Sequence, residues 1–450
     1  MEIYEKRRNY LFSDKSLYKL ILPLIVEQFL LVTVGLVDSM MTSSIGEAAV
    51  SAVSLVDSIN ILIINVFTAL ATGGAVVSGQ YLGQKKEDYA CKSADQLILF
   101  LMASSIGVMI LGYLCKNFIL YIVFGSIEQD VMNYSNTYLM IVFLSIPFIA
   151  VYNGGAALFR AMGNSKITMK ISIMMNLINI VGNYILIFKL KMGIAGAAIP
   201  TVFSRVVAAV VIFILIKNNN LPIHLSQKIC RKFDKTLIKK ILYIGVPNGL
   251  ENGMFQMGKI IVLNLISTFG TYAIAANAVG NFVALFQIIP GMAISQATLS
   301  VTSQCIGAGD YEQTKYYTKK LIKICTIAII ITVIITFVSI PLVLKAYNLS
   351  ANTAEISKII ILYHGSLSII IWTISFVLPN TLRAANDVKY CMIVAIFSMW
   401  VFRIGFSYIL GRYMNMGVIG VWVAMTIDWL FRGICFVKRY RGSKWKLHKI

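Results

Sequence analysis

Several acidic residues lie inside long apolar stretches of this 450-residue chain, where ionisable side chains are rare. Two of them are not expected to couple ions, because Asp57 lies near the end of its stretch and Asp428 can pair with Arg432 four residues later. Glu27 and Asp38 belong to the first such stretch, and Glu251 belongs to a later one. A charged side chain at the centre of a bilayer costs about 2.5–3.5 kcal/mol, so it is seldom kept without a partner or a purpose. A carboxylate in such a place can bind and release a cation. We therefore treat Asp38, Glu251 and Glu27 as candidate ion-coupling residues.

Glu27 and Asp38 are expected to project from nearly the same face of one helix. They are eleven residues apart, close to three whole helical turns, which separates them by about 16 Å along the axis. A face with two acids would be costly against lipid, so we expect it to face the protein interior or a water-filled cavity. The alternative is a salt bridge to Lys259 or Arg403 that ties helices together.

Glu251 lies 224 residues after Glu27, and each follows a proline, Pro247 or Pro23, by four residues. Because an acid is present at both places, we expect it to face an interface shared by two halves of the chain. Lys259 lies about two helical turns beyond Glu251. There it either joins helices or neutralises a nearby acid.

Four asparagines also lie in apolar stretches of the first half of the chain. Buried amides need hydrogen-bond partners or water, so they either line a polar cavity or join neighbouring helices. Both alternatives stay open for Asn153, Asn176, Asn179 and Asn183. As cavity-lining residues, these four and Lys259 are the candidates for contact with a substrate.

Helices that cross a membrane are the elements that would position these residues. Hydrophobic residues make up 58% of the chain and charged residues 13%, with a mean hydropathy of +0.78, which leaves too little polar surface for a soluble protein. About 20 apolar residues suffice for a helix to cross a bilayer. Charge-free runs and their Gly, Pro or Asn breaks predict twelve spans, at residues 17–43, 50–80, 93–115, 131–158, 168–190, 194–216, 238–268, 272–305, 320–344, 357–382, 390–411 and 416–437.

The second half of the chain repeats the first with an offset of 224 residues. The same offset that relates the prolines and glutamates places Gly46 on Gly270, and Arg160 meets Arg383 one residue out of step. Each half contains six predicted spans, an even number, so both halves enter the membrane in the same direction. The axis that relates them therefore runs along the membrane normal.

These patterns predict an all-α polytopic membrane protein with twelve transmembrane helices. The helices form two six-helix bundles related by a pseudo-two-fold axis along the membrane normal. We expect an N-lobe at residues 1–217, a cytoplasmic linker at 218–235, and a C-lobe with a basic tail at 236–450.

The basic residues predict the orientation of the chain. Most of the 40 Lys and Arg residues lie at the N-terminus, in the tail and in the even-numbered loops between spans, and cytoplasmic loops are the ones enriched in such residues. Both termini are therefore expected in the cytoplasm, for a multi-pass protein of the plasma (inner) membrane. This asymmetry explains the net charge of +21, which in a soluble protein would have suggested nucleic-acid binding. We expect no nucleic-acid partner.

The chain offers little for catalysis or metal binding. Its seven cysteines stand singly, without the spacing of a metal site or a disulfide framework. A membrane-embedded enzyme would need a nucleophile with a base or a metal cluster, yet His224, His364 and His448 are far apart in the sequence. We expect no enzymatic activity, no metal and no cofactor.

Four strings in a fixed order resemble the multidrug and toxic compound extrusion transporters, over nearly the whole chain. They are Pro23 followed fifteen residues later by Asp38, GQYLGQKKED at 79–88, MGIAGAAIPT at 192–201 and SQCIGAGDYEQ at 303–313. The resemblance implies export of organic molecules by alternating access, driven by inward flow of protons or sodium ions. It also implies that Asp38 matches a coupling aspartate, Glu251 a second-lobe glutamate, and Pro23 a helix-bending proline, with Pro247 as its repeat counterpart.

Two departures from the family pattern concern the cation sites. Many members follow the first asparagine of span 5 with an aspartate four residues later, whereas here Asn179 is followed by Asn183. Some members use an aspartate in span 10, whereas residues 359–382 contain no acid. A direct copy of those cation sites is therefore not expected.

Acids in spans 1 and 7 are available to meet a cation, which favours small-molecule transport. We expect a secondary active transporter that exports organic, cationic or amphipathic compounds in antiport with H⁺ or Na⁺, as a monomer in the lipid bilayer. The alternative is a flippase for lipid-linked oligosaccharide or another lipid, with a related architecture. A flippase would need several bases for phosphate, and Arg205, Lys259 and Arg403 are the candidates.

Overall fold

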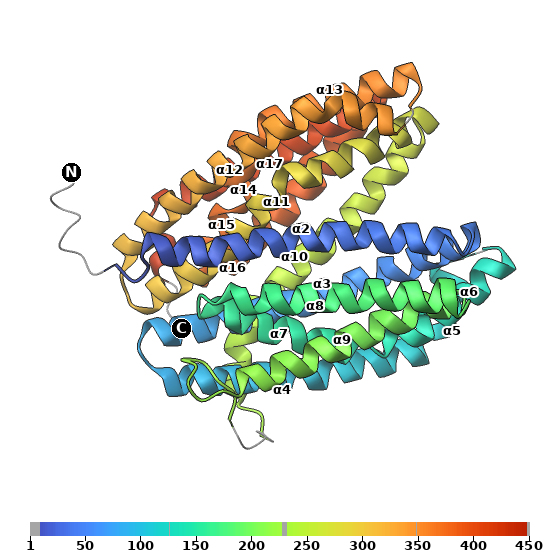
Figure 1. Cartoon of the computed structure of the whole chain (residues 1–450). Coiled ribbons are helices and arrows are strands. Elements are labelled where there is room, and N and C mark those ends of the chain that lie inside the picture. The colour runs from blue at the N-terminus through green and yellow to red at the C-terminus, as the bar shows by residue number, and fades with distance from the viewer. Residues whose placement is uncertain (1–9, 126, 227–231, 348, 448–450) are drawn as a thin grey trace. The chain divides into compact units, whose positions relative to one another are not determined.

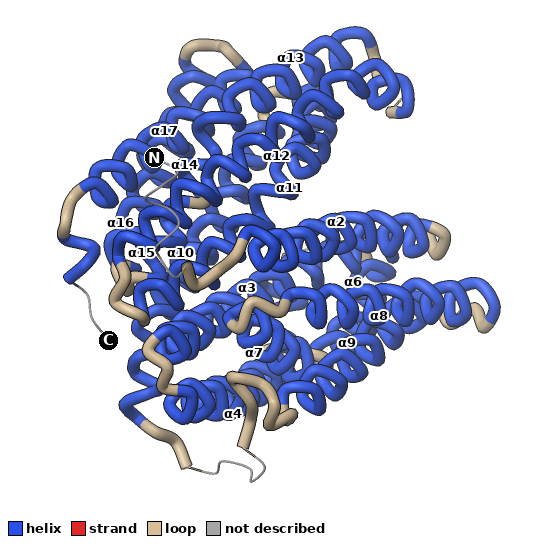
Figure 2. The backbone as a smooth tube through the Cα atoms, turned by 60° about the vertical axis from the view of Figure 1, so that its left-hand side comes forward, coloured by secondary structure: helices blue, strands red, loops and turns tan. Residues whose placement is uncertain are grey.

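The computed structural model describes residues 10–125, 127–226, 232–347 and 349–447. These residues form helices joined by loops, and no strand occurs among them (Figures 1 and 2). The first half contains α2 (Asp14–Ser43), α3 (Glu47–Gly83), α4 (Glu87–Leu114), α5 (Lys116–Phe118), η1 (Ile119–Val123), α6 (Gln129–Phe143), α7 (Ile146–Ala161), α8 (Ser165–Asn183), η2 (Tyr184–Lys189) and α9 (Ile194–Ile216). The second half contains α10 (Lys235–Ser267), α11 (Thr271–Gly307), α12 (Tyr311–Ala346), α13 (Ala351–Leu367), η3 (Ser368–Trp372), α14 (Thr373–Phe376), α15 (Leu378–Ala384), α16 (Val388–Ser398), η4 (Met399–Gly405), η5 (Ser407–Tyr413), α17 (Gly417–Arg441) and η6 (Lys444–Leu447).

Each of the twelve predicted spans corresponds to a helix or to a run of consecutive helices. In the described part of the chain, ten helical segments are long and apolar enough to cross a membrane. The pair α6 and α7, bent by 48°, makes an eleventh if it is counted as one span. The predicted span at 238–268 forms the helix α10, but its mean hydropathy is lower than that of the ten apolar segments. Polar residues such as Asn248, Asn252 and Gln256 lie near Glu251 in the sequence and lower it.

The repeat is visible in the backbone as well as in the sequence. Positive φ angles occur at pairs of positions related by the repeat, which are Gly46 and Gly270, Lys85 and Gly309, Gly163 and Asn386, Lys191 and Asn415, and Gly193 and Gly417. These positions lie in the connections between helices, where a left-handed residue lets the chain reverse. Both halves therefore place their turns at the same points.

A glycine contact at equivalent places closes the last helical hairpin of each half. Gly196 on α9 lies against η2, where an added Cβ would come within 2.9 Å of the carbonyl carbon of Leu186. Gly420 on α17 lies against η5 in the same way, with 2.7 Å to the carbonyl carbon of Leu410. Any side chain at either position would push the two helices apart.

The chain divides into two compact units. One comprises Leu22–Gly249, and the other comprises Met1–Ile21 together with Leu250–Ile450. The divisions fall within α2 and α10, near Pro23 and Pro247, and not in the predicted linker. The unit boundaries therefore differ from the lobe boundaries expected at 1–217 and 236–450.

Specific contacts explain this difference. The residues just before α2 pack with the second half of the chain, since the Phe12 carbonyl accepts from the hydroxyl of Tyr317 at 2.7 Å. The beginning of α10 packs with the first half, since a Cβ on Gly73 would lie 2.5 Å from the carbonyl oxygen of Ile241. Residues of the predicted linker also contact α4, where the amide of Ser226 donates to Asp95.

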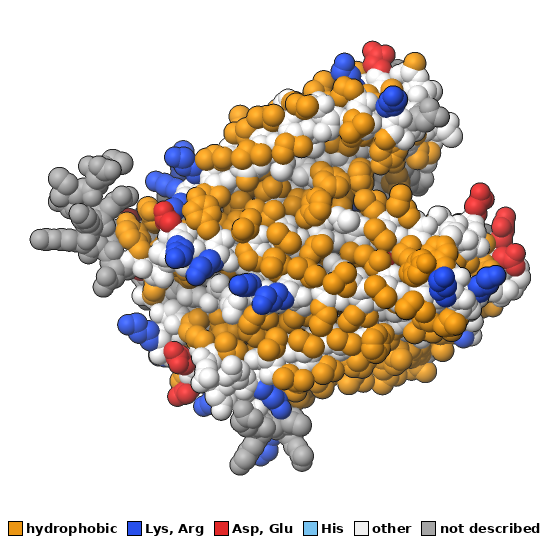
Figure 3. Space-filling view, in the orientation of Figure 1, with side chains coloured by type: hydrophobic (Ala, Val, Ile, Leu, Met, Phe, Trp, Pro, Cys, Tyr) orange, Lys and Arg blue, Asp and Glu red, His pale blue; other side chains and the backbone are white. Residues whose placement is uncertain are grey.

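Apolar side chains cover the middle of the visible helices, whereas charged side chains gather near the helix ends (Figure 3). Exposed large hydrophobic residues occur on many helices, among them Leu111, Ile214, Val338 and Ile434. An apolar belt between charged ends is the surface expected of a protein that spans a bilayer.

Candidate functional site

Asp38 on α2 is held by the amide side chains of α8. Asn183 donates from Nδ2 to Oδ1 of Asp38 at 2.8 Å. In the amide orientation that satisfies both of its neighbours, Asn179 donates to the same oxygen at 2.6 Å and accepts from the Thr201 hydroxyl at 3.0 Å. Asn179 and Asn183 are one turn apart and so share one face of α8. The structure thus brings together three of the predicted site residues.

No basic group lies within ion-pair distance of Asp38 in the described part of the chain. Its side chain is half-buried. Arg205 on α9 and Asp57 on α3 act on it electrostatically. Arg205 donates to the Ser145 hydroxyl at 2.7 Å, so its nearest partner is neutral. Asp38 is therefore a carboxylate that neutral donors stabilise without cancelling its charge.

Glu27, the other acid of α2, has a different environment. It is buried, and Arg160 on α7 donates to its Oε1 at 3.1 Å. The hydroxyl of Thr168 donates to Oε2 at 2.8 Å. Both carboxylate oxygens are therefore occupied, and the charge is balanced by an arginine of the same unit rather than by Lys259 or Arg403.

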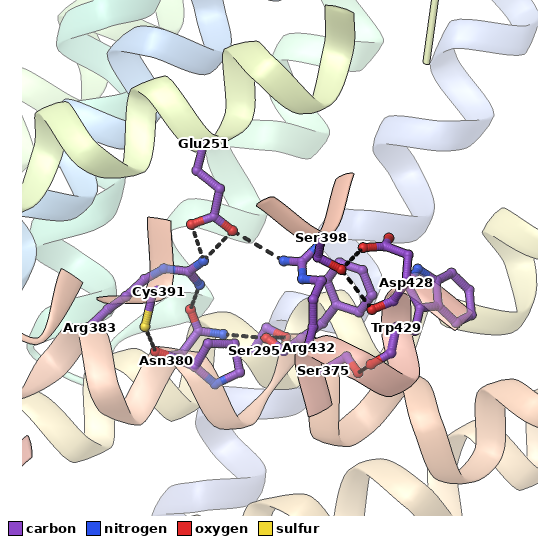
Figure 4. Close-up of polar contacts among 12 residues, drawn as sticks. Glu251, Ser295, Ser375, Asn380, Arg383, Cys391, Ser398, Asp428, Trp429 and Arg432 are labelled. Carbon is purple, nitrogen blue, oxygen red and sulfur yellow. Dashed lines mark hydrogen bonds and ion pairs between the residues drawn. The ribbon is translucent and has the colours of Figure 1, made fainter. Parts of the chain in front are cut away.

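Glu251 on α10 has the corresponding pairing in the second unit (Figure 4). Arg383 on α15 donates from one nitrogen to both carboxylate oxygens, at 2.8 and 2.7 Å. Arg432 on α17 adds a second cation at 3.2 Å. Since Arg383 is the repeat counterpart of Arg160, both halves carry the same glutamate–arginine pair. The second half differs in having two arginines on one carboxylate.

A second charged pair lies in the same unit. Asp428 accepts from the hydroxyl of Ser398 and lies 3.8 Å from Arg403. A pairing of Asp428 with Arg432, which follows it by four residues, is not found, because Arg432 contacts Glu251 instead.

Lys259 is exposed and lies over the ring of Phe255 at 5.0 Å. Arg403 lies 5.1 Å from the same ring. A single aromatic side chain thus attracts two cations, while the two like charges repel each other.

The other predicted residues are placed as follows. Asn153 on α7 donates to the Thr68 hydroxyl of α3 at 3.2 Å, a contact that joins helices. Asn176 is buried, and its amide nitrogen has no hydrogen-bond partner among the described residues. Pro23 and Pro247 lie inside α2 and α10, as predicted.

Sequence reasoning missed several functional neighbours. Arg160 and Arg383 are related by the repeat, and their nearly equal separations from the two glutamates, 133 and 132 residues, were the signal for the ion pairs. Arg432 and Thr168 carry no such signal, since contacts between distant helices depend on how those helices pack. His364 is buried, contacts Gln287 at 2.5 Å and packs edge-on against two tryptophans, a local network that spacing alone does not reveal.

In the ranges that the structure describes, no three His, Cys, Asp or Glu side chains come together as ligands would. His448 lies outside the described residues.

Known proteins match this chain along most of its length. The MatE family matches residues 23–185 and again residues 247–409, so the two matches are offset by 224 residues. The uncharacterized transporter YisQ of Bacillus subtilis is 27% identical, over 96% of each chain. The probable multidrug resistance protein NorM of Thermotoga maritima is 23% identical, over 98% of this chain and 97% of the relative.

The fold has a close match among solved structures. A multidrug resistance MATE family transporter of the MOP superfamily, in its outward-facing conformation, superposes with a TM-score of 0.88 at 20% identity, over 95% of each chain. This confirms the predicted all-helical, twelve-span membrane fold. The chain therefore belongs to the multidrug and toxic compound extrusion (MATE) family, whose members are membrane transporters and not enzymes.

Proposed function

We propose that this protein exports organic cations or amphipathic compounds across the plasma membrane by alternating access, in exchange for protons or sodium ions. Relatives named as multidrug resistance proteins support the export of organic compounds. The acidic groups inside the membrane-spanning helices support the coupling to a cation.

The observation that carries the proposal is the contrast between Asp38 and the two glutamates. Glu27 and Glu251 each contact at least one arginine, so the charge of each is balanced in this state. Asp38 receives hydrogen bonds from asparagine amides, which keep it oriented but leave its negative charge available. A carboxylate with this environment can bind a proton or a sodium ion.

Coupling requires that Asp38 exist in two states of differing charge. When the cation is bound, the Asp38 carboxylate is neutralised. The first helix then no longer needs a polar environment around this residue. When the cation leaves, the charge favours the conformation in which Asn179 and Asn183 can donate to it. Ion binding thereby shifts the balance between conformations, which is what antiport requires.

Glu27 and Glu251 are then proposed as structural groups that hold α2 to α7 and α8, and α10 to α15 and α17. For Glu27, this is the alternative of a salt bridge that ties helices together, with Arg160 as the partner in place of Lys259 or Arg403. Lys259 and the prolines Pro23 and Pro247 stay proposed as a cavity-lining base and as helix-bending positions.

The flippase alternative would need bases free to hold a lipid phosphate. Arg205 already donates to Ser145, and Arg403 forms an ion pair with Asp428. Of the three candidate bases, only Lys259 contacts neither a hydroxyl nor an acid in the described part of the chain, and it lies over the ring of Phe255. This set of contacts favours export of cations and amphipathic compounds.

The test is transport into everted membrane vesicles, with a proton gradient and a sodium gradient imposed separately. Vesicles that contain the wild-type protein should accumulate a cationic dye under one of the two gradients. Asp38→Asn should abolish this accumulation, while Glu47→Gln, which removes an exposed acid of the same unit, should leave it intact. Equal accumulation by the wild type with neither gradient imposed would contradict the proposal.

A further inference from the structure

The second unit carries an apolar groove that the proposed transport function does not use. It lies between α17 and the segment formed by η3 and α14, with a volume of about 440 Å³. Its walls are mainly branched aliphatic side chains, among them Ile370, Ile374, Leu430, Ile434 and Val437. Two basic residues, Lys438 and Arg441, stand at one end.

Gly433 forms the floor of this groove. A Cβ at this position would lie 3.1 Å from the hydroxyl of Ser375 and 3.4 Å from a methyl group of Ile374. The absence of a side chain lets α17 approach α14 closely. The side chains on either side stand out as ridges, since Ile370 is 66% exposed and Ile434 59% exposed.

The two basic residues at the end of the groove differ from the arginine between them. Arg439 donates to both carboxylate oxygens of Asp387, at 2.6 and 3.0 Å, and its charge is neutralised. Lys438 and Arg441 are exposed, and no acid of the described residues lies within ion-pair distance of either. They lie three residues apart on one helix, so they share a face.

The length of the groove fits one leaflet of a bilayer. Leu430 and Arg441 are separated by eleven residues of helix, which is about 16 Å. The hydrocarbon core of a bilayer is about 30 Å thick, so half of it is nearly the same length. The groove is therefore apolar over the length of one leaflet and ends at two cations that no acid neutralises. A phospholipid fits this arrangement, with its acyl chain along the groove and its headgroup at the cations.

We propose that this groove is a binding site for an anionic phospholipid of the surrounding bilayer. The acyl chain lies between Ile370 and Ile434, and the phosphate contacts Lys438 and Arg441. The basic end corresponds to the predicted cytoplasmic side, where anionic lipids give the membrane surface its negative potential. This proposal is independent of the transport mechanism, because none of these residues belongs to the Asp38 or Glu251 clusters.

Native mass spectrometry of the detergent-solubilised full-length protein tests this proposal. Phosphatidylglycerol and phosphatidylcholine with identical oleoyl chains are titrated separately, and inorganic phosphate is added as a competitor. The wild type should bind phosphatidylglycerol more tightly than phosphatidylcholine, and inorganic phosphate should not displace it, because the chain contributes to binding. Displacement by inorganic phosphate at similar concentration would overturn the lipid assignment.

Variants separate the charge from the groove. Each cation should contribute about fivefold to the affinity, so Lys438→Gln/Arg441→Gln should weaken phosphatidylglycerol binding by about 25-fold and abolish the preference for it. The matched control, Lys15→Gln/Lys444→Gln, removes the same charge from exposed positions of the same unit and should bind as the wild type does.

Ile434→Trp places a larger side chain in the groove and should weaken the binding of both lipids without changing the charge. Thermal unfolding is recorded for each variant, so that loss of binding is compared only among folded proteins. The proposed lipid site would be contradicted if Lys438→Gln/Arg441→Gln kept the wild-type preference for phosphatidylglycerol. It would also be contradicted if the control variant lost as much phosphatidylglycerol affinity.

Discussion

At the scale of single residues, the two acids of α2 differ in the kind of partner they have. Asp38 accepts from amides, whereas Glu27 accepts from an arginine and a threonine. Arginine is always charged, so it neutralises a carboxylate permanently, while an amide only orients it. The same helix therefore carries one acid suited to exchange of a cation and one suited to holding helices together.

Asp38→Asn should abolish gradient-driven export, because an amide cannot gain and lose a charge as the cation binds and leaves. The protein should still fold, since amide and carboxyl have nearly the same shape. Export under an imposed gradient and thermal unfolding measure the two effects. Full export by this variant would remove Asp38 from the mechanism.

Asn183→Leu should also impair export, because it removes the donor that lies 2.8 Å from Asp38. The effect should be smaller than that of Asp38→Asn, since Asn179 still donates to the carboxylate. Asn153→Leu is the matched control, because Asn153 contacts Thr68 of α3 and not Asp38. Equal export defects in both asparagine variants would show that the contact with Asp38 has no special role.

At the scale of elements, the repeated glutamate–arginine pair joins the first helix of each half to helices later in the same half. Glu251 sits against two arginines, Arg383 and Arg432, whereas Glu27 sits against one. Removal of one partner from a buried pair leaves the other charge uncompensated, at a cost of about 3–5 kcal/mol. The consequences should therefore be unequal in the two halves.

Glu251→Gln should destabilise the protein more than Glu27→Gln, since it leaves two arginines without their carboxylate. Melting temperatures in detergent measure this difference. The double variant Glu251→Gln/Arg383→Gln should recover part of the loss, because it removes one of the two cations. A melting temperature equal to that of the wild type for Glu251→Gln would show that the cluster does not hold these helices.

The glycine contacts that close the last helical hairpin of each half, at Gly196 and Gly420, allow a matched test of helix packing. Gly420→Ala should destabilise the protein by about 1–3 kcal/mol, because the new Cβ would overlap the backbone of η5. Gly196→Ala should behave alike, since the contact is repeated. Gly253→Ala is the control, because nothing lies within 4 Å of a Cβ there. Thermal unfolding distinguishes the three.

The sequence was informative about the positions of helices and turns, and less informative about which side chains contact one another. Apolar runs and the 224-residue offset predicted the spans, since membrane helices require long apolar segments. The boundaries were less accurate, since α12 (Tyr311–Ala346) begins nine residues before the predicted span at 320–344. Pairs such as Arg432 with Glu251 connect residues 181 positions apart, and only packing brings them together. The place where the compact units divide, inside α2 and α10, also depends on tertiary contacts and has no composition signal.

At the scale of the whole molecule, the repeat, the belt of apolar side chains and the family assignment describe a protein that crosses the membrane many times. The predicted orientation places both termini and residues 218–235 in the cytoplasm. Single-cysteine labelling of intact cells tests this, with Asn219→Cys in the linker and Asn415→Cys in the predicted outer loop after η5. An impermeant thiol reagent should modify the second and not the first, in a background without native cysteines. The reverse pattern would invert the topology.

The central claim is that Asp38 binds the coupling cation and gives it up when substrate binds. The most direct measurement is ion release from purified protein when a cationic substrate is added, followed in weak buffer for protons and with an ion-selective electrode for sodium. Wild-type protein and Glu47→Gln should release one of the two ions on substrate addition, and Asp38→Asn should bind substrate with no release. Undiminished release by Asp38→Asn would contradict the account and transfer the role to Glu251 or Glu27.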